Sequence, residues 1–71
     1  MNKISKPNIA KNIKKLRQKK GISQDWLSKH ADLSLNTIIN IEAKNKPNPT
    51  TETLEKIVNA FEVSIDDLLK K

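Results

Sequence analysis

Two pairs of side chains between positions 35 and 40 have types and spacings suited to contacting the edges of base pairs. Asn36 and Asn40 lie four residues apart, and a carboxamide can form two hydrogen bonds with N6 and N7 of adenine. Leu35 and Ile39 have the same spacing, and apolar side chains can pack against the methyl group of thymine. If these residues lie on one exposed face of a helix, that face fits the major groove of DNA.

The elements that must position these side chains are two short helices. Ser23 and Ser34 are suitable N-caps, and they predict helices over Ser23–His30 and Ser34–Ala43, joined by residues 31–33. The apolar residues Leu27, Ala31, Leu33, Ile38 and Ile41 would hold the two helices together. The outer face of the second helix would then present Leu35, Asn36, Ile39, Asn40 and Ala43.

The rest of the chain also has helical periodicity. Apolar residues recur at helical spacing between Pro7 and Gly21, where a glycine follows two lysines and predicts the end of a first helix. Thr50 is expected to cap a fourth helix, and Ser64 with Asp67 resembles a capping box for a short fifth helix. No segment alternates with a period of two, so we expect an all-α fold of five helices.

Charge is distributed unevenly along the 71 residues. The formal net charge is +6, and residues 1–20 carry eight cations and no acid. A basic segment of this kind favours a polyanionic partner, although a lysine-rich solvated surface would give the same composition. The chain has no cysteine and one glycine, which excludes disulfides, cysteine-ligated metals and a glycine-rich phosphate loop. We therefore expect no enzymatic activity, no cofactor, no metal site, no small-molecule ligand and no membrane association.

Four motifs in order along the chain resemble the lambda-repressor-like, Cro-type family of prokaryotic regulators, the xenobiotic-response-element class. They are Ile13 to Arg17, "GISQ", "LSLNTIINIE" and "NPTTETLEKIVNAFEVSIDDLL", and they cover about residues 8–70. The resemblance implies a compact domain over residues 7–71 with a helix-turn-helix at its second and third helices. Residues 1–6 are expected to be a flexible basic arm.

The resemblance also assigns roles to residues. Base contacts are expected from Ser34, Leu35, Asn36, Ile39 and Asn40, and phosphate contacts from Ser23, Gln24, Thr37, Lys44, Asn45 and Lys46. Arg17 and Glu42 are expected to form a structural ion pair. Lys11 and Lys14 would add longer-range attraction. Asp32 departs from the family, which has glycine in this turn at a position that often requires a positive φ.

The function implied is sequence-specific binding of double-stranded DNA by a small cytoplasmic transcriptional regulator, a repressor. Because the base-contacting helix carries no lysine or arginine, the common guanine contact is missing and an A·T-rich palindromic operator is expected. A homodimer would place two half-sites about 34 Å apart.

The alternative is an antitoxin-like or other protein-binding module, which exposed Leu35, Ile39 and Trp26 would favour. Trp26 would otherwise pack over a lysine stem or a neighbouring helix, and His30 is expected at the surface.

Overall fold

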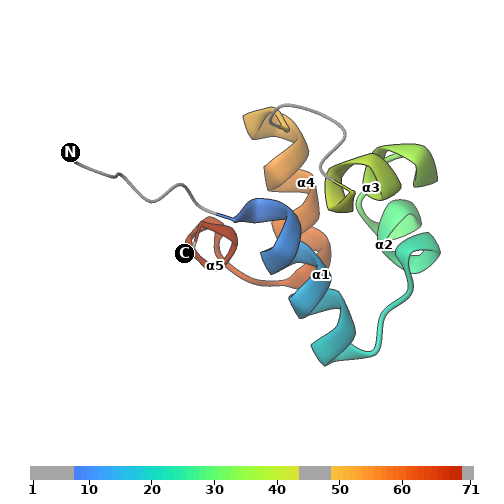
Figure 1. Cartoon of the computed structure of the whole chain (residues 1–71). Helices are drawn as coiled ribbons and strands as arrows, with labels where there is room; N and C mark the ends of the chain where they lie inside the picture. Colours follow the sequence, from blue (N-terminus) through green and yellow to red (C-terminus); the bar gives the residue numbers. More distant parts are fainter. Residues whose placement is uncertain (1–7, 44–48, 70–71) are drawn as a thin grey trace.

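The computed structural model describes residues 8–43 and 49–69, and this part of the chain contains five helices and no strand. The helices are α1 (Ile9–Lys20), α2 (Gln24–His30), α3 (Leu35–Glu42), α4 (Thr51–Phe61) and α5 (Ile65–Leu68). The all-α, five-helix expectation is confirmed. Figure 1 shows α1 crossing in front of α4, with α2 and α3 on one side of this pair and α5 on the other.

Polar caps determine where the helices begin. The side chains of Asn8, Ser23, Ser34 and Thr50 each accept a hydrogen bond from a backbone N–H in the first turn of the helix that follows. The α2 and α3 helices therefore begin one residue later than predicted, because the two serines are caps rather than helical residues. Ala43 is likewise the C-cap of α3. The predicted capping box is present at α5, where the Asp67 carboxylate accepts from the Ser64 backbone N–H at 3.2 Å.

Three residues adopt the left-handed conformation where the chain changes direction. Gly21 has a φ of 68° at the end of α1, Asp32 has 57° in the turn between α2 and α3, and Glu62 has 60° at the end of α4. The positive φ that the family resemblance implies for Asp32 is therefore present. It allows the chain to turn between the two helices within a few residues.

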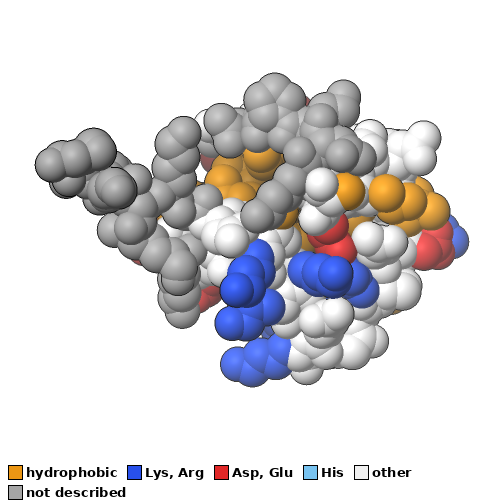
Figure 2. Space-filling model, viewed as in Figure 1, with side chains coloured by type: hydrophobic (Ala, Val, Ile, Leu, Met, Phe, Trp, Pro, Cys, Tyr) orange, Lys and Arg blue, Asp and Glu red, His pale blue; other side chains and the backbone are white. Residues whose placement is uncertain are grey.

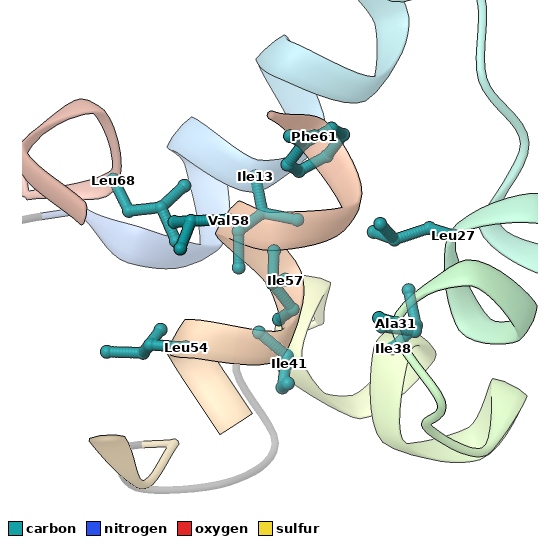
Figure 3. Packing of buried hydrophobic residues seen from close by; sticks show 10 residues of the cluster. All are labelled: Ile13, Leu27, Ala31, Ile38, Ile41, Leu54, Ile57, Val58, Phe61 and Leu68. Carbon is teal, nitrogen blue, oxygen red and sulfur yellow. The ribbon is translucent and has the colours of Figure 1, made fainter. Parts of the chain in front are cut away.

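One apolar core joins all five helices. Figure 3 shows buried side chains from α1, α3, α4 and α5 converging with Leu27 of α2 and Ala31 after it. Leu33 is only partly buried against this core. The fully buried members are Ile13, Leu27, Ile38, Ile57, Phe61 and Leu68. Because Phe61 and Leu68 are used in the core, neither is available to a partner, whereas Leu69 is 39% exposed.

The packing of α2 and α3 on this core leaves one long side of α3 uncovered. The α3 helix contacts α2 and α1, while α2 also contacts α4. None of the helices in the described residues is long and apolar enough to cross a membrane.

Candidate nucleic-acid interface

The outward face of α3 carries the side chains predicted to contact bases. Ile38 and Ile41 point into the core, at 0% and 6% exposure. Leu35 and Ile39 on the opposite side are 40% and 38% exposed, and Asn36 is exposed while Asn40 is half-buried. The folding of α3 therefore follows its amphipathic pattern, with the two large apolar side chains of the outer face left in solvent.

An ion pair attaches the end of α3 to α1. Arg17 Nε lies 2.8 Å from Glu42 Oε2, and Arg17 Nη2 donates to Glu42 Oε1 at 3.0 Å. A third donor, Arg17 Nη1, bonds the carbonyl of Ile22 at 3.0 Å. The pair expected between Arg17 and Glu42 is present, with side chains only 14% and 5% exposed. The hydrogen bonds that Arg17 donates to Glu42 raise the pKa of Arg17 above its usual value.

Gln24 extends this pair to α2. Its Nε2 donates to Glu42 Oε1 at 3.1 Å, so the single carboxylate of Glu42 holds side chains from α1 and α2 against the end of α3. This bond is not among those that the family resemblance implies. The Gln24 amide carries a second N–H donor besides the one that bonds Glu42.

A hollow of about 400 Å³ lies between these groups and the outer face of α3. Its lining comes from all three helices and their caps: Lys14, Arg17, Ser23, Gln24, Ile39, Glu42 and Ala43. Figure 2 shows the same side of the molecule, with cationic side chains over α1, an apolar patch over α2 and α3, and acidic side chains between them. Of the two lysines expected to add longer-range attraction, Lys14 lines this hollow together with Ser23 and Gln24, whereas Lys11 does not.

Three of the predicted contact residues also have a role in capping. The hydroxyl of Ser34 accepts from the Thr37 backbone N–H at 3.0 Å and lies 2.8 Å from the Thr37 hydroxyl. The hydroxyl of Ser23 accepts from the Trp26 N–H at 2.9 Å. Each of these groups fixes the start of its helix and still keeps hydrogen-bonding capacity. The remaining predicted phosphate contacts, Lys44, Asn45 and Lys46, lie outside the described residues.

Trp26 has a neighbour that the sequence analysis missed. Its ring stacks on His30, with ring centroids 3.6 Å apart and planes inclined by 11°. His30 Nδ1 also lies 2.9 Å from the Trp26 carbonyl oxygen. The ring contact that the structure gives for Trp26 is a stack within α2, and packing over a lysine stem or a neighbouring helix stays a prediction. The i, i+4 spacing of the two rings was the signal available in the sequence.

Within residues 8–43 and 49–69, no three His, Cys, Asp or Glu side chains are grouped so that they could hold a metal ion. The site described above consists instead of amide, hydroxyl and apolar groups beside a lysine. These groups suit an extended surface that carries both polar edges and anionic phosphates.

Comparisons with known proteins agree with this geometry. A family model described as a helix-turn-helix domain matches residues 10–71. The DNA-bound crystal structure of SinR, the master regulator for biofilm formation, is 32% identical, has a TM-score of 0.80, and is matched over 84% of this chain and 95% of that one. The N-terminal DNA-binding domain of SinR from Bacillus subtilis is also 32% identical, with a TM-score of 0.82 and coverage of 89% and 91%.

A second group of similar structures consists of restriction-modification controller proteins. Wild-type C.Esp1396I is 32% identical over 87% of this chain and 80% of that chain, with a TM-score of 0.79. C.AhdI from Aeromonas hydrophila is 21% identical, with a TM-score of 0.83 and coverage of 89% and 94%, and shares the fold. No curated protein sequence matches the chain significantly. The family-model match over nearly the whole chain shows that it belongs to the helix-turn-helix domain family, in the lambda-repressor-like, Cro-type class.

Proposed function

We propose that this chain is a transcriptional regulator that binds double-stranded DNA in a sequence-specific manner, with α3 in the major groove. The observation that carries the proposal is the outer face of α3, where Leu35 and Ile39 are exposed beside two asparagines. This face is held in position by the bonds from Arg17 and Gln24 to Glu42. A helix presented in this way fits the width of the major groove.

The proposed contacts fall into two groups. Ser34, Leu35, Asn36, Ile39 and Asn40 contact base edges, and Ser23, Gln24, Thr37, Lys44, Asn45 and Lys46 contact phosphates. Lys14 joins the second group, because it lines the same hollow as Ser23 and Gln24. A lysine supplies charge without base information, so these contacts provide affinity and orientation while α3 provides specificity.

The protein acts as a repressor in the cytoplasm, where a homodimer bound to a palindromic operator blocks a promoter. A helix of eight residues such as α3 spans about 12 Å and therefore only a few base pairs. Two copies related by a two-fold axis double the number of base pairs recognised. The SinR structure with DNA supports the choice of ligand.

Selection of bound sites from random duplex DNA at two salt concentrations tests this proposal. The selected duplexes should share a sequence, and neutralisation of about four phosphates per subunit should give a log–log salt slope of about −4 per subunit. Binding that is independent of salt, or that retains no common sequence, would contradict the proposal.

The exposed Trp26 ring, stacked on His30, favours a second candidate function, a protein-binding module. Leu35→Ala and Asn40→Ala distinguish the two functions. A DNA-reading α3 requires both variants to bind the selected site more weakly than wild type while they keep their helical circular-dichroism spectrum. Asn59→Ala, an exposed asparagine of α4, is the matched control and should bind as wild type. Loss of a protein partner with DNA binding unchanged would favour the second function.

A further inference from the structure

The outer face of α3 repeats one pair of residue types. Leu35 and Asn36 form the first apolar–amide pair, and Ile39 and Asn40 form the second pair one helical turn later. We propose that these pairs contact two A·T base pairs about two base-pair steps apart, with each asparagine bonding adenine and each apolar side chain contacting a thymine methyl group. This inference rests on the DNA-binding function proposed above.

The spacing of the two pairs matches the spacing of stacked bases. Residues four apart in an α-helix are separated by about 6 Å along the axis, and successive base pairs rise by about 3.4 Å. One helical turn therefore corresponds to about two base-pair steps when α3 lies along the groove. Because positions i and i+4 share a face, both pairs meet the same stretch of DNA.

The two amides are available to a ligand. Neither the Asn36 nor the Asn40 side chain has a hydrogen-bond partner among the residues that the structure describes. An asparagine offers one donor and one acceptor group, which complements N7 and N6–H of adenine. Guanine presents two acceptors at the same edge, so the amide oxygen would face an acceptor and remain unpaired.

The apolar side chains favour thymine over cytosine through the methyl group. Cytosine has an N4–H donor in place of the O4 acceptor of thymine, and it lacks the C5 methyl group. Contact between that methyl group and exposed apolar side-chain surface is favourable, and cytosine cannot make it. The 40% and 38% exposure of the two side chains provides that surface.

Charge favours base edges over phosphates as the groups that this face contacts. The α3 helix contains no lysine or arginine. Its one charged residue, Glu42, accepts from Arg17 and Gln24 and is only 5% exposed. The outer face is therefore neutral. Of the two cations that line the adjoining hollow, Arg17 is paired with Glu42 and Lys14 lies to one side. A neutral amide and apolar face suits the uncharged edges of A·T pairs.

Chemically modified duplexes test the inference on the selected site. Replacing thymine by deoxyuridine removes only the methyl group, and we expect about fourfold weaker binding at each contacted position. Replacing adenine by 7-deazaadenine removes the N7 acceptor, and loss of the bidentate contact should weaken binding roughly 5- to 150-fold. The same modifications outside the contacted pairs should change the dissociation constant less than twofold.

Double-mutant cycles assign each contact to its residue. Asn36→Ala should lose the response to 7-deazaadenine at one adenine and keep it at the other, and Asn40→Ala should show the reverse. Leu35→Ala and Ile39→Ala should divide the response to deoxyuridine in the same way. Asn59→Ala should keep all of the responses, because it lies on α4.

The outcomes separate the inference from the function on which it rests. If no duplex of any sequence is retained in the selection, both the proposed function and the inference are overturned. If duplexes are retained but the shared sequence is G·C-only, or the modifications and variants show no coupling, the DNA-binding function stands and the A·T inference is wrong. Position-specific coupling at two A·T pairs supports the inference.

Discussion

Glu42 accepts hydrogen bonds from Arg17 and Gln24, so its removal leaves two donors on two other helices without their partner. We expect Glu42→Ala to lower the free energy of unfolding by about 3–5 kcal/mol, because it breaks a largely buried ion pair and leaves the guanidinium uncompensated. Urea denaturation followed by circular dichroism measures this loss.

The exposed ion pair within α2 is the control for this prediction. Lys29 and Asp25 are 3.1 Å apart with side chains 74% and 58% exposed, and Lys29→Ala should cost less than about 1 kcal/mol. Equal losses for Lys29→Ala and Glu42→Ala would contradict a special role for the buried pair.

The ion pair between Arg17 and Glu42 also predicts how stability depends on pH. The hydrogen bonds to Glu42 raise the pKa of Arg17 in the folded state, so the stabilisation that it provides is complete below the unfolded pKa and is lost only as pH rises through the folded one. Arginine stays charged in both states at every pH used for unfolding measurements. The Arg17 contribution should therefore be constant between pH 7 and pH 9.

The sequence predicted which side chains lie on the outer face of α3, but it predicted only part of the hydrogen bonding that holds the end of this helix in place. Leu35, Asn36 and Ile39 were placed correctly because helical periodicity fixes which side of α3 is covered. The bond from Gln24 to Glu42 was not predicted, since a glutamine side chain has several rotamers and partners within its reach. The assignment of these residues to bases and phosphates remains a prediction.

At the end of α4, the backbone conformation does not match the residue type. Glu62 ends α4 with a φ of 60°, a conformation that costs about 1–2 kcal/mol for residues other than glycine. Glycine adopts it freely but loses more entropy on folding. We expect Glu62→Gly to raise the free energy of unfolding by about 0.5–1 kcal/mol, measured by thermal or urea denaturation.

Glu55→Gly is the matched control, since it changes the same residue type inside the helix that Glu62 caps. Glu55 is exposed in the interior of α4, so the substitution should lower the free energy of unfolding by about 1 kcal/mol. Gly21→Ala should also be destabilising, because its φ is 68° even though a Cβ there would contact nothing within 4 Å. A stabilising effect of Glu55→Gly, or a destabilising effect of Glu62→Gly, would contradict the conformational argument.

These helix ends differ in how far the sequence predicts them. A glycine at position 21 predicts a left-handed backbone conformation, because glycine is the residue type that favours it. The starts of the helices are predicted by the N-cap residues Ser23, Ser34 and Thr50. Glu62 carries no such signal, because glutamate is a common residue inside helices. Tertiary packing of Phe61 and Leu68 in the core, at 2% and 0% exposure, requires the chain to turn between them.

Across the whole molecule, net charge indicates a class of partner without locating the contact. Eight of the fourteen cations lie in residues 1–20, yet among the described residues Lys14 alone of the lysines lines the hollow beside α3. Lys15 and Lys19 line a different hollow of about 420 Å³ together with Asp67. The fold separates neighbouring lysines because successive helical positions point about 100° apart.

Assembly of two copies on DNA is the last property to be tested. Two leucines follow one another at the end of α5, and Leu69 is 39% exposed while Leu68 is buried. If Leu69 contributes to the contact between copies, Leu69→Asp places a charge in an apolar interface and leaves the core intact. We expect this variant to keep its unfolding midpoint and its affinity for a single half-site, and to bind a two-half-site duplex at least tenfold more weakly (about 1.4 kcal/mol).

A change in the DNA provides the independent control, because it leaves the protein untouched. Half-sites on one face of the duplex lie about 34 Å apart, and five inserted base pairs rotate one half-site by about half a turn relative to the other. Wild-type protein should then bind the altered duplex about as weakly as Leu69→Asp binds the original. If the insertion has no effect, the two half-sites are bound by independent copies. If the insertion weakens binding but Leu69→Asp does not, the copies contact each other through a different surface.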